Sequence, residues 1–551
     1  MDTSSRPSPP PRPSPPPSSS PSPPPRGDLP DRIADLRADL QDLDHTVDRV
    51  AAVLGERASA ALHREQPLDA EQVTAALLQS TASAQGRGVA ALVRFFTLGL
   101  PIDVTDLDAA LPRTGAAGLV ELGLATAVGP DAPTQLRSTC DLRPYGDESH
   151  TWWVTSDHAE LAVRGPLPVE HVLGIGGAST TLASWTPRPQ VERALDLGTG
   201  CGVQALHLGG HTAYGIVATD LSERALAHAR FTAALNGVDL DLRQGSLLEP
   251  VAGEQFDLIV SNPPFVITPR SGEVPVYEYR DGGRAGDALV ADLVGDLGAH
   301  LRPGGIAQLL ANWELRPEED WREHVSGWLA GTGLDAWVVQ RDVQDVAEYA
   351  ETWVRDGGQV PGTPSFQALY AAWLADFDAR GIERVGFGVV TLQRPRAERE
   401  PWRDLIEVAT PVAAPMGPSV LRGLEARTWL AEHDEQDLLD IAWQVADDVT
   451  EERVGRPGAP DPQVIQLRQG GGLRRVIRLS TIGAGFVGAC DGELTAAQLC
   501  AGLAAVTGAE PADVRAEVVP LLRELVKDGL VRWSAGCEGQ SQGGEGLRWL
   551  G

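Results

Sequence analysis

The chain has 551 residues, enough for two to four domains with at least one sizeable core. Its formal net charge of -30 repels phosphate backbones at long range, which disfavours non-specific binding to nucleic acids. No apolar run is long enough to cross a membrane, and the N-terminus lacks the apolar core of a signal peptide. We therefore expect a cytoplasmic protein.

The first 27 residues are almost wholly Pro, Ser and Arg, a composition that forms no core and predicts a disordered, locally polyproline II tail. Residues 28–150 then read as helices that end in a small hairpin, as in a winged-helix-like domain. The helix that would recognise DNA carries no cluster of cations. We therefore favour a docking role for this part, toward a protein or a substrate.

Residues 151–395 alternate short apolar strands with amphipathic helices, a pattern that predicts a doubly wound, mainly parallel sheet. An insertion at about 341–382, with Trp353, Tyr370 and Trp373, reads as helical, and we expect it to cap part of the substrate side. The predicted strands are ALDL (194–197), GIVATD (215–220), LDLRQ (240–244), FDLIVS (256–261), GIAQLLA (305–311), LDAWVVQ (334–340) and VGFGVVTLQ (385–393).

Residues 396–551 combine a strand-like stretch with helices and a turn at Pro511, which predicts a second winged-helix-like unit and a loose tail. The stretch LRQGGGLRRVIRLS is locally basic and forms either a basic patch or an exposed edge strand with solvated charges; we favour the edge strand. Its four arginines are Arg468, Arg474, Arg475 and Arg478.

Five cysteines are scattered along the chain without C-x-x-C spacing or a nearby histidine cluster, which argues against both a disulfide framework and a zinc site. They are Cys140, Cys201, Cys490, Cys500 and Cys537. Cys201 stands within a glycine-rich loop, where packing of a small side chain is a better interpretation than a nucleophile, because no base is evident nearby.

That loop, in ALDLGTGCGVQALHL, follows the first predicted strand and leads into a helix. Gly198, Gly200 and Gly202 allow a tight turn with positive φ and a ligand lying against the backbone, near the free N–H groups of a helix N-terminus. A P-loop would require Gly-Lys-Ser/Thr, and a dinucleotide fold would use G-x-G-x-x-G. The observed G-x-G-x-G spacing, with Asp196 before it, resembles motif I of class I S-adenosylmethionine-dependent methyltransferases.

Asp220 ends the second strand, where an acid accepts both hydroxyls of a ribose; this arrangement is shared with dinucleotide folds. The stretch SNPPF ends the fourth strand. Its two prolines impose a rigid extended backbone, so that the Asn262 side-chain oxygen and the Pro263 carbonyl accept from one planar –NH2 group while Phe265 stacks on it. Two such acceptors orient the nitrogen of an amide or exocyclic amine for methylation without a strong base. A structural Asn-Pro turn is the alternative.

Together these motifs make residues 170–395 resemble the small-methyltransferase group of class I enzymes, which includes HemK-like release-factor glutamine methyltransferases and RsmC-like guanine-N2 rRNA methyltransferases. The resemblance implies an α/β fold with a Rossmann-like seven-stranded sheet, flanked here by two mainly helical, winged-helix-like domains. It also implies S-adenosylmethionine as the methyl donor. The cofactor positions that it implies are Asp196, Gly198, Thr199, Gly200, Gly202, Asp220, Leu221, Ser246 and Asn262, with Thr180 and Thr181 near the methionine end.

The same resemblance assigns Asn262, Pro263, Pro264 and Phe265 to catalysis and the acceptor. Ser246 departs from it, because this position often holds an Asp that contacts the adenine amino group. In the following loop, YEYRDGGRAGD, Tyr279, Arg280 and Asp281 either contact substrate or form a solvated turn. No metal site is expected.

Three hypotheses remain for the function. Methylation of a protein glutamine amide agrees with the acidic surface and the additional domains, and we favour it. Methylation of a purine amino group in rRNA, tRNA or DNA, with Phe265 stacked on a displaced base, agrees with the winged-helix-like flanks and the arginines at 474–478. A non-catalytic scaffold that binds S-adenosylmethionine is disfavoured by the intact motifs.

Overall fold

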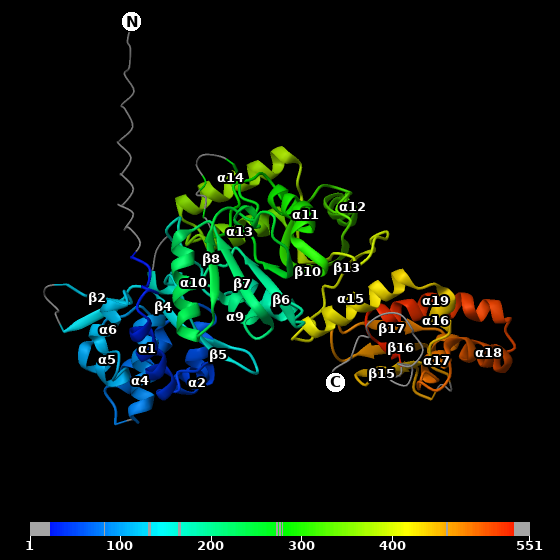
Figure 1. Ribbon diagram of the computed structural model, residues 1–551, viewed down its shortest axis with the longest axis horizontal. Helices are drawn as coiled ribbons and strands as arrows, with labels where there is room; N and C mark the ends of the chain where they lie inside the picture. The colour runs from blue at the N-terminus through cyan, green and yellow to red at the C-terminus, as the bar shows by residue number, and fades with distance from the viewer. Residues whose placement is uncertain are drawn as a thin grey trace, which may run out of the picture.

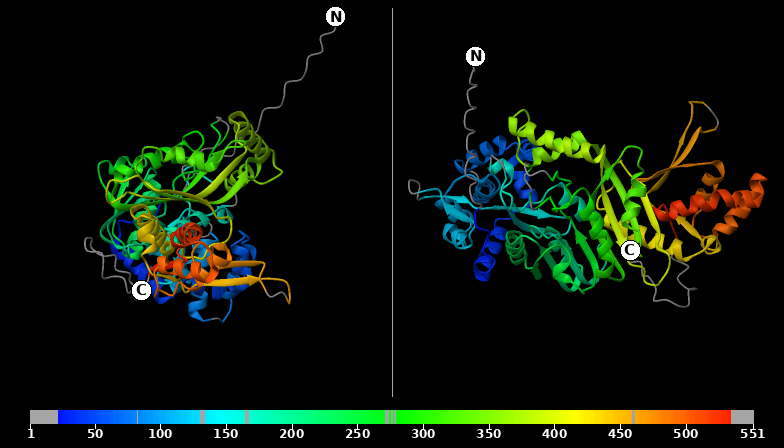
Figure 2. Two further views of the ribbon diagram at one scale, coloured as in Figure 1. Left: turned by 90° about the vertical axis from the view of Figure 1, so that its right-hand side faces the viewer. Right: turned by 90° about the horizontal axis from the view of Figure 1, so that it is seen from above.

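The computed structural model describes residues 22–533, apart from 82, 130–133, 164–166, 271–273, 275–276, 278 and 459–460. Three parts follow one another along the long axis of the molecule: a helical N-terminal part, a central open sheet covered by helices, and a C-terminal part (Figures 1 and 2). The predicted tails at 1–21 and 534–551 lie outside the described residues.

The N-terminal part consists of helices and a hairpin of β2 and β3, as the sequence suggests, and β1 adds a third strand to make a small antiparallel sheet in the order β1-β3-β2. Its core contains many leucines and the edge-to-face pair Phe95–Phe96. Its elements are α1 (Pro30–Asp42), α2 (Val47–Leu62), α3 (Leu68–Leu78), α4 (Ala84–Leu92), η1 (Val93–Thr97), β1 (Ile102–Asp103), α5 (Val104–Ala110), α6 (Gly115–Glu121), β2 (Ala125–Ala127) and β3 (Gln135–Ser138).

The expectation of a disordered tail through residue 27 is wrong for its last residues. Pro25 is buried, and the Arg26 backbone N–H donates to the Leu122 carbonyl oxygen at 2.8 Å. This contact cannot be predicted from the Pro-rich composition, because the partner, Leu122, lies almost a hundred residues away in the chain.

A hairpin joins the N-terminal part to the centre. It comprises β4 (Asp141–Gly146) and β5 (Thr151–Ser156), so the predicted boundary at 150 falls inside it. β5 packs on α10 (Glu223–Asn236), and Phe231 and Leu235 of α10 belong to the N-terminal core. Arg37 donates to the Leu235 carbonyl oxygen at 2.7 Å, at the C-terminal end of α10, where unpaired carbonyls favour a cation. The N-terminal part is therefore packed directly on a helix of the central part.

The central sheet has the strand order β13-β11-β12-β10-β9-β6-β7-β8. All seven predicted strands are present, and β12 is antiparallel to both of its neighbours. The strand order reverses between β6 and β9, which makes the carboxyl ends of these strands the expected ligand crevice. The strands are β6 (Val191–Leu197), β7 (Thr212–Asp220), β8 (Leu240–Gln244), β9 (Phe256–Ser261), β10 (Leu301–Leu315), β11 (Asp335–Asp345), β12 (Arg384–Gln393) and β13 (Arg403–Glu407).

Helices cover both faces of this sheet. On one face α8 (Gly177–Trp185), α9 (Val203–Leu208) and α15 (Gly417–Glu432) pack on the strands, and on the other α11 (Ala288–His300) and α12 (Trp321–Trp328) do so. β13 is an eighth strand, parallel to β11. Both β13 and α15 follow the predicted boundary at 395, so the central layers extend into the part that we assign to the C-terminal domain. Two short helices complete the region, α7 (Glu160–Val163) and η2 (Glu249–Val251).

The insertion between β11 and β12 is helical, as predicted, and consists of α13 (Val346–Asp356) and α14 (Pro364–Arg380). Thr363 caps the N-terminus of α14, and Pro364 occupies its first position, where a missing N–H costs nothing. Both helices pack against Val266 and Ile267, just after NPPF. The insertion thus lies beside the segment that was expected to meet the substrate.

A buried arginine helps to join the C-terminal part to the edge of the sheet. Arg427 of α15 lies over the ring of Trp337 at 3.7 Å, contacts Asp404 of β13 at 2.7 Å and Asp528 at 3.1 Å, and is 3% exposed. The elements of this part are α16 (Glu435–Leu439), β14 (Trp443–Val445), β15 (Val449–Val454), β16 (Val464–Gln469), β17 (Val476–Leu479), α17 (Thr481–Gly488), α18 (Ala496–Thr507), α19 (Pro511–Lys527) and β18 (Val531–Trp533).

The locally basic stretch runs from β16 to β17. Arg468 pairs with Glu452 at 2.6 Å, and Arg475 pairs with Asp528 at 2.8 Å, so two of its four cations are neutralised within the chain. In the part of the chain that the structure describes, no helix is long and apolar enough to span a membrane, and no cluster of metal-ligating side chains is present.

Candidate active site

Three strands bring the sequence motifs to one edge of the sheet. Leu197 of β6 is in register with Thr219 of β7 on one side and with Ser261 of β9 on the other. Ser261 Oγ donates to the Leu197 carbonyl at 2.8 Å, and the N–H groups of Gly198 and Thr199 donate to the Thr219 carbonyl at 2.9 Å. The glycine loop, Asp220 and NPPF therefore leave the sheet side by side.

The glycine loop has the backbone shape that its composition predicts. Gly198, Gly200 and Gly202 have φ of +74°, +54° and +87°, which disfavours any residue with a Cβ. A Cβ on Gly202 would lie 3.2 Å from Ala229 Cα, so this glycine lets α10 approach closely. A Cβ on Gly200 would meet nothing within 4 Å, and one on Gly198 would meet only the Asn262 carbonyl oxygen, at 4.0 Å. The loop thus leaves open space beside NPPF.

Asp196 holds this loop from inside. Its Oδ2 accepts hydrogen bonds from Thr199 Oγ1 at 2.6 Å and from the Ala205 N–H at 2.9 Å, while Oδ1 has no partner among the described residues. Complete burial raises the pKa of Asp196 to about 7, although the two hydrogen bonds act in the opposite direction. Its role is therefore to shape the loop from beneath.

This burial predicts a pH-dependent stability. Because the folded-state pKa of Asp196 lies above its ordinary value of 3.8, the folded protein binds the proton more tightly, and stability falls as pH rises from about 4 to 7. Asp196→Asn removes the titration. We compare the unfolding temperatures of the variant and the wild type, both without cofactor. The difference, variant minus wild type, should increase by about 3 °C or more as the pH rises from about 4 to 7. Differential scanning calorimetry in matched buffers measures it; parallel curves for the two proteins would contradict the assignment.

Asp220 connects the second strand to the glycine loop. Its Oδ2 accepts the Gly200 N–H and its Oδ1 accepts the Ser222 N–H, both at 2.9 Å. Burial raises the pKa of Asp220, and these backbone hydrogen bonds oppose the change. Each carboxylate oxygen retains a further lone pair for a ligand, so this carboxylate fits a pair of hydroxyl groups at the edge of the crevice.

The other residues that were predicted to bind the cofactor differ in their exposure to solvent. Ser246 follows β8 and is half-buried, and the Gly245 N–H donates to the Asp220 carbonyl oxygen at 3.0 Å. Leu221 is 64% exposed. Thr180 and Thr181 are exposed on α8, and Thr180 Oγ1 bonds to the carbonyls of its own helix. α8 packs beside the loop helix α9, and no hydrogen bond joins either threonine to the glycine loop among the described residues.

NPPF contains one of the buried polar atoms that lack a hydrogen-bond partner among the described residues. This atom is Asn262 Oδ1. Buried acceptors are almost always paired, and an orphaned one costs about 1–3 kcal/mol. An acceptor kept at this cost beside the open glycine loop is ready for a donor from outside the chain.

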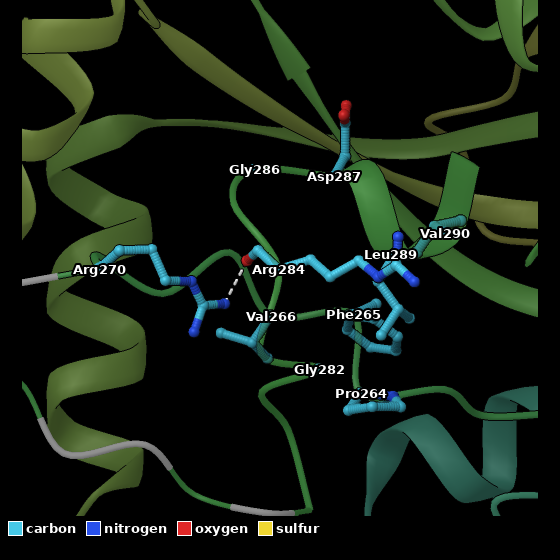
Figure 3. Close-up of a pocket in the computed structure, with 10 residues that line it drawn as sticks. All are labelled: Pro264, Phe265, Val266, Arg270, Gly282, Arg284, Gly286, Asp287, Leu289 and Val290. Atoms are coloured by element: carbon cyan, nitrogen blue, oxygen red, sulfur yellow. Dashed lines mark hydrogen bonds between the residues drawn. The ribbon is translucent and has the colours of Figure 1, made fainter. Parts of the chain in front are cut away.

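Phe265 is fixed by its neighbours. It forms an isolated bridge with Asp281, and the Val266 N–H donates to the Arg280 carbonyl at 2.9 Å. Figure 3 shows a pocket beside it that measures only about 10 Å³, enough for one water and far too small for an acceptor. The lining residues are Pro264, Phe265, Val266, Arg270, Gly282, Arg284, Gly286, Asp287, Leu289 and Val290.

Tyr279 and Arg280 do not form a solvated turn. Tyr279 Oη donates to Asp356 Oδ2 at 2.7 Å, and Arg280 contacts the same oxygen at 2.5 Å and is 6% exposed. Burial raises the pKa of Tyr279, which keeps the phenol protonated. Both side chains are used to hold the loop against α13, a role that their sequence context does not reveal.

Comparison with known proteins agrees with this geometry. A family model described as the methyltransferase small domain matches residues 174–327. A release factor glutamine methyltransferase of Deinococcus radiodurans is 33% identical over 192 residues, which are 30% of this chain and 69% of the relative. The chain belongs to the methyltransferase small-domain family.

Further relatives of this methyltransferase have related names. A release factor glutamine methyltransferase of Xylella fastidiosa is 32% identical over 31% of the chain and 72% of the relative. A ribosomal protein uL3 glutamine methyltransferase of Xanthomonas campestris is 37% identical over 22% of the chain and 42% of the relative. The solved structure of the 16S rRNA methyltransferase RsmC of T. thermophilus matches 57% of the chain and 70% of its own, with 14% identity and a TM-score of 0.26. Two models described as domains of unknown function match residues 42–137 and 422–533.

Cys201 has a packing role in the methyltransferase, as expected. It is 3% exposed and lies in a cluster with Trp152, Val203 and Leu206. Burial raises the pKa of the Cys201 thiol to about 11, so the thiolate that a nucleophile requires is disfavoured.

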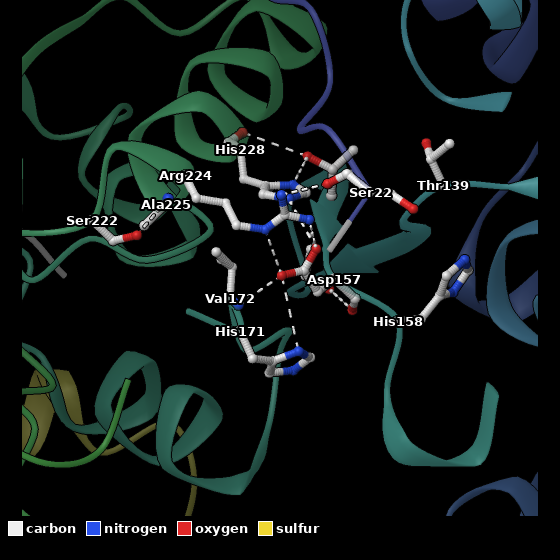
Figure 4. A network of polar contacts seen from close by, with 12 residues as sticks. Ser22, Thr139, Asp157, His158, His171, Val172, Ser222, Arg224, Ala225 and His228 are labelled. Atoms are coloured by element: carbon white, nitrogen blue, oxygen red, sulfur yellow. Dashed lines mark hydrogen bonds and ion pairs between the residues drawn. The ribbon is translucent and has the colours of Figure 1, made fainter. Parts of the chain in front are cut away.

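A buried ion-pair network in the methyltransferase was not predicted from the sequence. Asp157, which follows β5, accepts from Arg224 Nε at 2.8 Å and from the Val172 N–H at 2.9 Å, and it lies 3.6 Å from His228 (Figure 4). Burial alone would raise the pKa of Asp157, but hydrogen bonds from Arg224 and His228 lower it well below its usual range. The network fixes the start of α10, just after Asp220, to the segment that leads to α8.

Proposed function

We propose that this methyltransferase transfers a methyl group from S-adenosylmethionine to the side-chain amide of a glutamine in a protein. The observation that carries the proposal is the buried Oδ1 of Asn262, which has no partner in the described part of the chain and lies beside the glycine loop. An amide N–H is the complementary donor. The names of the relatives, which are glutamine methyltransferases of release factors and of ribosomal protein uL3, favour the same acceptor.

The residues at the crevice fit S-adenosylmethionine. The open space over Gly200 admits a ligand against the backbone, and Asp220 offers its carboxylate to the two ribose hydroxyls. When bound, this molecule supplies an electrophilic methyl group, which the acceptor nitrogen gains while the electron pair of the broken carbon–sulfur bond stays on sulfur. The nitrogen then releases one proton to water.

The chain's own contribution is to orient the acceptor. Asn262 Oδ1 accepts one N–H of the –NH2 group, the Pro263 carbonyl accepts the other, and Phe265 contacts the flat face of the amide. Holding both N–H bonds directs the nitrogen lone pair toward the donor and stabilises the positive charge that develops on nitrogen. Charge stabilisation and positioning carry the reaction, and no strong general base is required.

A transfer assay with fractionated extract tests the acceptor class. The purified chain is incubated with methyl-labelled S-adenosylmethionine and cell extract, and the product is divided between nuclease and protease. We expect the label to resist nuclease, to be released by protease, and to reside on a glutamine-containing peptide whose mass has increased by one CH2. Asn262→Ala protein is the control. Label released by nuclease would instead establish a purine amine as the acceptor, and the proposal would fail.

A further inference from the structure

We propose that Tyr349, on the inserted helix α13, is a positioning residue for methyl transfer, because it fixes the backbone that carries Asn262 and Phe265. The inference rests on the proposed function. It assigns a role in the same reaction to an element that the family match does not cover, since that match ends at residue 327.

Tyr349 forms a buried hydrogen-bonded junction. Its hydroxyl oxygen accepts the Ile267 N–H and the Asn312 Nδ2–H, each at 3.0 Å. All three residues are at most 1% exposed. Ile267 lies two residues after Phe265, and Asn312 lies on β10, which pairs with β9. One oxygen thus joins the segment after NPPF to the sheet and to the insertion.

The ring of Tyr349 is held as firmly as its hydroxyl. Trp353, Trp373, Phe377 and Phe387 surround it with ring centroids 5.6–6.0 Å away. This packing fixes the position of the hydroxyl oxygen. The two N–H groups that donate to this oxygen, from Ile267 and Asn312, are therefore held in fixed positions as well. Burial also raises the pKa of Tyr349, which keeps the phenol neutral.

The same helix holds the other arm of the loop. Asp356, at the C-terminal end of α13, accepts from Tyr279 Oη at 2.7 Å, and the Trp353 carbonyl accepts from Arg280 at 2.8 Å. The two arms are joined by the Val266 N–H to Arg280 carbonyl hydrogen bond. Helix α13 therefore clamps both arms of the loop that begins at NPPF, with Tyr349 at the arm nearest the reacting group.

The clamp has a chemical purpose. NPPF orients a planar nitrogen only if Asn262 Oδ1 and the Phe265 ring keep their spacing, and misplacement by about 1 Å costs roughly a hundredfold in rate. The prolines stiffen residues 263–264, and the hydrogen bond to the Arg280 carbonyl holds Val266. The Tyr349 hydroxyl holds the next residue, Ile267, and ties it to the sheet through Asn312.

Tyr349→Phe removes the accepting oxygen and keeps the ring. We expect kcat to fall about tenfold or more, the affinity for S-adenosylmethionine to remain within about twofold, and hydrogen exchange of the peptide covering 262–268 to accelerate. Tyr370→Phe is the matched control, because this tyrosine lies on α14 and packs on the same apolar cluster, but its hydroxyl forms no hydrogen bond with the described residues. It should leave all three measurements unchanged.

The measurements separate the possible failures. Unchanged exchange at 262–268, or faster exchange with unchanged kcat, would overturn the positioning role. A fall in cofactor affinity and melting temperature together with kcat would indicate a merely structural residue, and would overturn it as well. If no transfer to protein is found, the proposed function fails, whereas the exchange measurement still tests the clamp. Tyr349→Phe with wild-type kcat, beside an inactive Asn262→Ala protein, would refute only the positioning proposal.

Discussion

Replacing Asn262 by alanine is expected to lower kcat for methyl transfer by about a thousandfold, the scale of losing one aimed hydrogen-bonding group from a transition state. The affinity for S-adenosylmethionine should stay within several-fold, because the glycine loop and Asp220 remain in place. Isothermal titration calorimetry measures the affinity, and initial rates at saturating donor measure kcat.

Stability provides an independent signature of the same residue. Asn262 Oδ1 is buried and has no partner among the residues that the structure describes, so its removal should leave the melting temperature unchanged or raise it. Asn236→Ala is the matched control. Its amide bonds to Trp153 N, Trp153 O and Thr232 O at 2.7–2.9 Å, so that variant should lose stability and keep kcat. Retained activity in Asn262→Ala protein would refute the acceptor clamp.

Asp220→Ala is expected to weaken binding of S-adenosylmethionine about tenfold to a hundredfold, the effect of losing one or two hydrogen bonds to a charged group. Part of this loss arises within the chain, because Asp220 also holds the Gly200 N–H. The rate at saturating donor should largely recover, which separates this carboxylate from Asn262. Calorimetry at several donor concentrations measures the effect.

Asp241→Asn is the control for Asp220. Asp241 lies on the neighbouring strand β8, its side chain is 55% exposed, and it pairs with Arg243 at 2.6 Å. Removing its charge changes the net charge equally but touches nothing in the crevice, so donor affinity should not change. Equal affinities in wild-type and Asp220→Ala protein would remove this residue from the ribose site.

The sequence predicts the inner strands of the central sheet well, because they are largely buried and read as continuous apolar runs. FDLIVS matches β9 residue for residue. LDLRQ also matches β8 residue for residue, although this strand lies at the edge of the sheet and is half-exposed. β13 was not predicted, because it lacks a continuous apolar run. Its sequence, RDLIE, is only half-buried at the edge of the sheet, and nothing in it distinguishes an edge strand from a loop.

The site is predictable where local geometry dictates the residue type. Glycines with positive φ and an acid at a strand end are visible in the sequence, and the structure brings Gly200, Asp220 and Asn262 together. Tyr349 and Asp356 are not visible in this way. Each reads as one more residue of an amphipathic helix, because its partner lies about 80 residues earlier in the chain.

The contacts of Arg427 have a consequence for the design of shorter proteins from this chain. A fragment trimmed to the family match at 174–327 would lose β11, β12 and β13 from the central sheet, and one ending at 395 would lose α15, the helix that covers Trp337. Either truncation exposes a large apolar surface to water, which favours aggregation. The methyltransferase domain therefore cannot be cut at either of these boundaries without exposing its core. The N-terminal and C-terminal parts that pack on it contribute to its stability.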